Sequence, residues 1–413
     1  MMKVLVSGAS VAGPAVAHWL GRYGYDVTVV ELQPALREGG YAVDFRGPVN
    51  REVLSRMGVL EDLRARQTGG SPMRFVDAAG RQLMRLPGEF AGGELEVLRS
   101  DLSRVLYEHS CDKASYRFGD SIARLAEHAG GVDVSFESGT EETYDLVIGA
   151  DGLHSIARRL AFGPEKDYVR HLGYYIAGWD VPNTLGISGD ALIYNVPGRL
   201  ASVGADRRDP AMAGTMVLFK SPALTYDRRD LEQQKAFIAA AFADLGWHVP
   251  QLLEGLPAAT ELYVDSISRV DVDRWSTGRV VLLGDAGYGA TVGGMGTSTA
   301  VVAAYILAGE LATSGGDYRA AFRRYEAQLR RPVSKTQSGG NRTGKFLAPG
   351  TRFGIAARNR LLSQPFLLHQ MLKLGEKVSN LVELNNYSVS SGRVRRNDSQ
   401  ESGNHPGTPS TAR

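Results

Sequence analysis

The chain has 413 residues, of which 43% are apolar and 22% are charged, and its formal net charge is +2. This is the composition of a globular protein long enough for two domains. Lysine and arginine are scattered, which disfavours a nucleic-acid partner, and Cys111 is the single cysteine, so no intrachain disulfide can form.

The first segment has features of an export signal, because Lys3 precedes an apolar run and "AVA" resembles a cleavage site. Gly8, Ser10 and Gly13 interrupt that run at positions suited to a turn. No later segment offers the roughly 18 uninterrupted apolar residues of a membrane span. We therefore expect a cytoplasmic protein without a membrane span.

The opening predicts a strand over 3–7, a helix over 13–23 and a second strand that ends at Glu31. The turn between the first two elements is "GASVAG", residues 8–13, and approximates the dinucleotide pattern G-x-G-x-x-G with Ser10 in place of the middle glycine. Such a turn presents helix N–H groups to a pyrophosphate, and an acid about 20 residues later binds ribose hydroxyls. The pattern favours a nucleotide site.

Two alternatives fit the same turn. A nucleophile elbow, G-x-S-x-G, is approximated by "GASVA" and again by "GTSTA" at 296–300, but both lack the last glycine and no histidine has a recognisable partner motif. An ordinary turn without a ligand is the other reading. The eight histidines show no metal-ligand spacing, so no metal site is predicted.

The middle of the chain, from about 71 to 95 and from 166 to 275, has β-rich runs separated by Gly, Pro and Asp, which is typical of antiparallel meanders. A buried strand returns at 279–285 and an apolar helix is predicted from Gly296 to Thr313. Amphipathic helices follow to about residue 390. From 391 the sequence has little to bury and is expected to be disordered.

Two later motifs extend the nucleotide hypothesis. "GADGLHSIAR" at 149–158 follows a buried strand and carries Asp151, Ser155 and Arg158 in the pattern G-A-D-G-x-x-S-x-x-R. A second strand ends in Gly284 and Asp285, at the carboxyl edge where ligands bind in parallel sheets.

With these three motifs in order, the chain resembles the single-component (group A) FAD-dependent aromatic hydroxylases of the para-hydroxybenzoate hydroxylase fold, close to tetracycline-inactivating and actinobacterial polyketide-tailoring monooxygenases. The resemblance implies an α/β fold with a Rossmann-like FAD-binding domain of the GR2 type, an inserted and mostly antiparallel β-sheet substrate domain, and C-terminal helices. The expected boundaries are 1–70, 96–165 and 276–335 for the FAD domain, 71–95 and 166–275 for the substrate domain, 336–390 for the helices and 391–413 for a disordered tail.

By the same resemblance, a set of residues is expected to contact the cofactor. Its members are Gly8, Ser10, Val11, Ala12, Gly13, Glu31, Arg46, Arg99, Asp151, Arg158, Asp285, Gly294, Met295 and Gly296. Family members commonly have prolines after the Gly-Asp motif, whereas this chain reads "GYGATVGGMG".

The implied activity is an NADPH-dependent monooxygenase that adds oxygen to an aromatic or polyketide-like molecule through a flavin C4a-hydroperoxide, with O2 as co-substrate and NADPH bound transiently. The flavin carries the chemistry, so no certain catalytic side chain is expected. Substrate candidates are Tyr175, Trp179, Tyr194, Arg199 and Phe219, although aromatic residues at alternating strand positions are commonly core. A flavin oxidase or reductase, or a non-catalytic flavin- or nucleotide-binding protein, remains open, as does a monomer or a homodimer.

Overall fold

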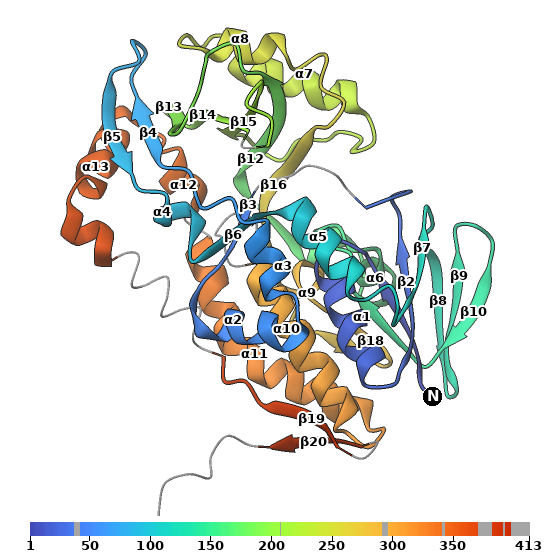
Figure 1. Ribbon diagram of the computed structural model, residues 1–413. Helices are drawn as coiled ribbons and strands as arrows, with labels where there is room; N and C mark the ends of the chain where they lie inside the picture. The colour runs from blue at the N-terminus through green and yellow to red at the C-terminus, as the bar shows by residue number, and fades with distance from the viewer. Residues whose placement is uncertain are drawn as a thin grey trace, which may run out of the picture.

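The computed structural model, shown in Figure 1, describes residues 1–36, 42–206, 208–290, 296–340, 343–370, 382–390 and 393–397. Within these residues the fold is mixed α/β, as predicted, and two large sheets of six and seven strands organise it. No helix in this part of the chain combines the length and the apolar character needed to cross a membrane.

The six-stranded sheet has the order β17-β18-β11-β1-β2-β7, and its neighbours pair in parallel except β17 with β18. Its strands are β1 (Lys3–Ser7), β2 (Asp26–Glu31), β7 (Ser115–Phe118), β11 (Leu146–Gly149), β17 (Ser276–Thr277) and β18 (Val280–Leu282). The central strands are continuous apolar runs because both faces of the sheet are covered. One face packs on a three-stranded antiparallel sheet made of β8 (Ile122–His128), β9 (Gly131–Phe136) and β10 (Glu141–Tyr144).

Helices cover the opposite face of the six-stranded sheet. They are α1 (Ala12–Arg22), α2 (Gly47–Met57), α3 (Leu60–Ala65), α5 (Arg99–Glu108), α10 (Gly296–Ala312) and α11 (Tyr318–Gly340). The short helices α6 (Ile156–Ala161), η1 (Glu165–Asp167) and α9 (Asp285–Tyr288) follow strand ends, and β3 (Ala42–Phe45) pairs with β6 (Leu95–Leu98).

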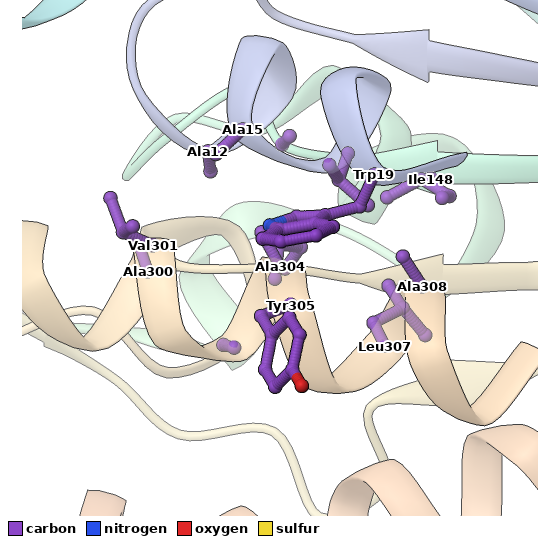
Figure 2. Packing of buried hydrophobic residues seen from close by; sticks show 14 of the residues in the cluster. Ala12, Ala15, Trp19, Ile148, Ala300, Val301, Ala304, Tyr305, Leu307 and Ala308 are labelled. Carbon is purple, nitrogen blue, oxygen red and sulfur yellow. The ribbon is translucent and has the colours of Figure 1, made fainter. Parts of the chain in front are cut away.

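Alanines let α1 and α10 approach closely (Figure 2). Ala12 and Ala15 of α1 face alanines of α10, and Trp19 lies between the two helices and Ile148 of β11. The ring of Tyr305 meets Trp19 edge-on, with centroids 4.9 Å apart. Because α10 is buried on every side from Ala300 to Leu311, it forms the centre of this half of the molecule.

The seven-stranded sheet has the order β16-β12-β15-β14-β13-β4-β5, and its neighbours are antiparallel except β13 with β4. Its strands are β4 (Met73–Val76), β5 (Gln82–Leu86), β12 (Val169–Pro182), β13 (Ala191–Val196), β14 (Arg199–Ala205), β15 (Met212–Lys220) and β16 (Tyr263–Val270). Helices α7 (Leu231–Phe242) and α8 (Val249–Glu254) cover one face. Helices α12 (Thr343–Leu347) and α13 (Arg352–Leu362) pack on the other, near the short helix α4 (Glu89–Gly92).

The end of the chain differs from the expectation of helices to residue 390 and disorder from 391. Strands β19 (Asn386–Ser390) and β20 (Arg393–Asn397) form an antiparallel hairpin. Tyr387 anchors it, because this side chain is only 5% exposed and packs against α10. A hairpin of two short strands with one buried aromatic residue has too short a hydrophobic pattern to be predicted from the sequence. The rest of the expected tail, 391–392 and 398–413, lies outside the described residues.

His18 is expected to make the stability of the protein depend on pH. It is buried on α1, its Nδ1 atom bonds to the His109 carbonyl oxygen at 2.8 Å, and burial lowers its pKa from 6.5 to about 4. The unfolded chain therefore takes up this proton first, so the free energy of unfolding should fall as the pH drops below about 6.5.

Between about pH 7.5 and about pH 5 we expect His18 to account for a loss of about 2 kcal/mol. Urea unfolding of the protein and of His18→Gln, which keeps a donor for the His109 carbonyl, measures the difference. Equal losses in the two proteins would contradict the assignment.

Candidate active site

The glycine turn between β1 and α1 closes tightly. A Cβ atom on residue 13 would lie 1.8 Å from the Gly8 carbonyl oxygen, so only glycine lets α1 begin where it does. Gly8 itself has φ +105° and abuts the Ala150 carbonyl. Val11, at the start of α1, provides no side-chain cap, which leaves helix N–H groups available to an anion.

Glu31 reaches this turn from the end of β2. Its carboxylate accepts hydrogen bonds from the backbone N–H of Ala9 at 2.7 Å and of Gln33 at 2.9 Å. These bonds hold the acid beside the glycine turn and leave further lone pairs on both carboxylate oxygens. The sequence analysis expects Glu31 to contact a ribose, and the structure places its carboxylate beside the glycine turn.

Arg99 and Asp285 bring two opposite charges to the same end of the sheet. Arg99, the first residue of α5, donates to the Ser10 hydroxyl at 3.3 Å. Asp285 follows β18 in a recess: surrounding protein raises the pKa of its carboxyl, Arg99 lowers it and Asp265 raises it, while the side chain remains open to solvent. An accessible carboxylate walled in by protein suits hydroxyl groups of a ligand.

Gly296 begins α10 close to Asp285, because a Cβ atom there would lie 3.5 Å from the Asp285 Oδ1 atom. Gly284 brings the starts of α1 and α10 together, since its own Cβ would contact Ala12 and Ala300. Gly294 and Met295, which the sequence analysis also expects to contact the cofactor, lie outside the described residues.

Arg46 has a partner that the sequence analysis missed. Its Nε atom contacts the carboxylate of Asp44, and its guanidinium donates to the Phe90 carbonyl at 3.0 Å. Asp44 is 5% exposed and burial raises its pKa, while Arg46 opposes that shift. An acid in a short strand, two positions before an arginine that directly follows the strand, was the available signal, because alternate residues of an extended chain share a face.

Asp151 and Arg158 hold the protein together at this point. Asp151 accepts hydrogen bonds from the Ser7 hydroxyl at 3.0 Å and from two backbone N–H groups at the start of α6. Arg158 is fully buried and donates to the carbonyls of Leu153 at 2.7 Å and Ala286 at 2.8 Å. Asp151 therefore ties α6 to β1, and Arg158 ties it to α9, which begins at Asp285. Arg158 has no exposed surface with which to touch a cofactor.

The five predicted substrate residues do not line a common chamber. Tyr175, Trp179, Tyr194 and Phe219 are buried in the cluster beneath α7 and α8. Arg199 instead binds the carboxylate of Asp244 and the Ala241 carbonyl, at the end of α7. Their aromatic character reflects core packing, the commoner meaning of such a pattern.

The other face of the same sheet carries the open side chains. Strand pairing aligns Gly178, Met216, Ser202 and Ile193 in one row across β12, β15, β14 and β13, and Tyr263 of β16 continues that row. Met216 and Tyr263 are only partly buried, and they pack on the same apolar cluster as Phe90 and Phe346. The sequence offered no means of choosing between the two faces, because both repeat every second residue.

These features are typical of a dinucleotide-binding α/β protein. They are a glycine turn, an acid at the end of the second strand, a helix start without a side-chain cap, and an accessible carboxylate at the edge of a parallel sheet. A family model described as FAD binding domain matches residues 1–336. The chain belongs to that family and to its FAD-dependent monooxygenases of the group A aromatic hydroxylase type, which confirms the resemblance inferred from the three motifs.

Three similar proteins support this assignment. A Mycobacterium tuberculosis protein is 42% identical over 82% of this chain and 92% of its own. A flavin-dependent monooxygenase of Legionella longbeachae is 39% identical over 82% of this chain and 88% of its own. The crystal structure of the tetracycline destructase Tet(55) is 36% identical, with a TM-score of 0.81, over 94% of this chain and 100% of that one.

Proposed function

We propose that the protein is an NAD(P)H-consuming FAD monooxygenase that hydroxylates, or inserts oxygen into, an aromatic or polyketide-like molecule. The observation that carries the proposal is the arrangement of Asp285, Ser10 and Arg99 around the uncapped start of α1, in a chain related to flavin-dependent monooxygenases. The FAD unit would consist of 1–70, 96–165 and 276–335, and the substrate unit of 71–95 and 166–275.

When bound, FAD supplies electron transfer from a nicotinamide to dioxygen and delivery of one oxygen atom to the substrate. The protein's own residues would bind and orient the reactants. The first turn of α1 holds the pyrophosphate, Glu31 the adenosine ribose and Asp285 the ribityl hydroxyls. Arg99 offers a positive charge near Ser10 that compensates the phosphates.

The substrate would lie on the face of the seven-stranded sheet that carries Met216 and Tyr263. This face is apolar and only partly covered by α12 and α13, and β16 places it beside α9, which begins at Asp285. Asp265 of the same strand is near enough to raise the pKa of Asp285. A planar, largely apolar ring system matches such a surface.

Purified protein would be tested for flavin, for NADPH and NADH oxidation, and for product formation. We expect a bound yellow cofactor and substrate-dependent NAD(P)H oxidation with phenols, naphthoquinones, anthracyclines or tetracyclines. Incorporation of one oxygen atom from labelled dioxygen is the expected product signature. Oxidised product without label would indicate an oxidase, and a yellow protein that oxidises no nicotinamide with any of these compounds would favour a binding protein.

Met216→Trp is expected to raise the KM for the substrate by about tenfold or more, because the indole fills space on the substrate-facing row. Steady-state kinetics with the substrate found in that screen measures this change. Phe219→Leu is the matched control, since Phe219 lies on the α7 face, and its KM should stay unchanged. If Phe219→Leu changed the KM and Met216→Trp did not, the substrate would lie on the α7 face of the sheet, which would contradict the proposal.

A further inference from the structure

The C-terminal ends of three helices meet the segment 382–387. These helices are α1, α2 and α10, and their N-terminal ends lie at the flavin site: α1 follows the glycine turn, α2 follows Arg46 and α10 begins beside Asp285. Figure 1 shows β19 at the end of α10 far from the seven-stranded sheet. The segment 382–387 therefore contacts these three helices at the ends opposite the proposed flavin site.

Tyr387 makes the central contact with α10. Its ring lies directly on Gly309, where a Cβ atom would come within 2.2 Å of the ring, so the helix is shaped to receive an aromatic side chain. Its hydroxyl donates to the carboxylate of Glu310 at 2.7 Å. Glu310 is fully buried and is also bonded by Arg324 and Gln328 of α11.

This arrangement makes Tyr387 part of the solution to a buried charge. A buried carboxylate is costly unless its oxygens are satisfied, and here the partners come from α11 and from the segment 382–387. Undocking the segment would remove one of these bonds and uncover Gly309. Docking is thus coupled to the position of α10.

The same segment reaches α1 and α2. The Asn385 carbonyl accepts from the Tyr305 hydroxyl at 2.8 Å and from Arg56 of α2 at 3.2 Å. Tyr305 stands between Trp19 of α1 and Tyr387, with ring centroids 4.9 and 5.2 Å away. One continuous set of aromatic contacts therefore joins the segment to the helix that follows the glycine turn.

We infer that residues 382–387 form a strap that fixes the far ends of α1, α2 and α10, so that docking of the strap and binding of FAD stabilise each other. The strap lies beyond residue 336, where the family match ends. Coupling between two binding events is reciprocal, which gives the inference two independent measurements.

The first measurement is FAD affinity of the full-length protein after flavin removal, by fluorescence titration. Tyr387→Phe keeps the ring on Gly309 and removes the bond to Glu310, and we expect FAD binding to weaken about three- to tenfold. Tyr318→Phe is the matched control, because Tyr318 is a buried tyrosine of α11 whose hydroxyl has no partner among the described residues. Its FAD affinity should match that of the parent protein.

The second measurement is amide hydrogen exchange of 382–387 in the unsubstituted protein. Adding FAD should slow exchange of the strap by a factor similar to the affinity change. Exchange that is the same with and without FAD would overturn the inference, even if Tyr387→Phe failed to fold. A Tyr387→Phe protein with a lower Tm but unchanged FAD affinity would also overturn it, because the strap would then be a stabilising contact only.

Discussion

Gly13→Ala is expected to yield a protein that does not retain flavin. The added methyl carbon would lie 1.8 Å from the Gly8 carbonyl oxygen. The oxygen is a backbone atom and the methyl carbon is bonded directly to the backbone, so neither can move away unless the chain itself moves. Either α1 shifts away from β1 or the turn opens, and in both cases the N–H groups of the first helical turn move away from the proposed pyrophosphate position. We expect a cost of about 3 kcal/mol or more, equivalent to FAD binding weakened more than about a hundredfold.

Retention of flavin is measured after desalting by the absorbance at about 450 nm, where oxidised flavin has a band. Gly246→Ala is the control, because a Cβ atom there meets nothing within 4 Å and its backbone is not left-handed. That variant should be as yellow as the parent protein. A Gly13→Ala protein that folds and holds FAD with parental affinity would show that the turn does not bind the pyrophosphate.

The nucleotide half could be predicted from the sequence because its signals are local. Each key position lies at the end of a strand or shortly after it: Gly8 directly after β1, Glu31 as the last residue of β2 and Asp285 just beyond β18. Parallel strands bring their carboxyl ends to one edge, so chain order and the position along each strand were enough to bring these residues together.

The proposed substrate face could not be predicted in the same way. Tyr175 and Phe219 alternate with their neighbours just as Met216 does, and period-two alternation is identical for both faces of a sheet. The choice of face depends on α7 and α8, which pack on one side, and on α12 and α13, which pack on the other. Helices α12 and α13 lie more than 100 residues beyond most strands of this sheet in the sequence. Large aromatic residues marked the face that is filled by core.

The roles of Asp151 and Arg158 were also beyond a local pattern. The motif fixes their spacing around α6, but it does not say whether their polar atoms point to a ligand or to the protein. The Ser7 hydroxyl, which binds Asp151, comes from β1, and the Ala286 carbonyl, which binds Arg158, comes from α9, the helix that begins at Asp285. Only the tertiary structure brings these partners within hydrogen-bond distance.

Arg158→Met is expected to destabilise the protein by about 3 to 5 kcal/mol, the cost of removing one side of a buried, hydrogen-bonded charge site. The methionine fills similar volume but leaves the Leu153 and Ala286 carbonyls without a donor, and Glu165 loses an ion-pair partner 3.8 Å away. Urea unfolding measures the loss. Arg159→Met is the control on the next residue, which is exposed and should change stability by less than about 0.5 kcal/mol.

Arg158→Lys separates support of the core from positioning of Asp285. A lysine keeps the positive charge near Glu165, but its single ammonium group cannot span the two carbonyls as the guanidinium does. Because Ala286 directly follows Asp285 in α9, loss of that bond should loosen the start of this helix and weaken FAD binding by about tenfold. If Arg158 only filled the core, Arg158→Lys would lower the free energy of unfolding while FAD titration of the folded protein gave the parental affinity.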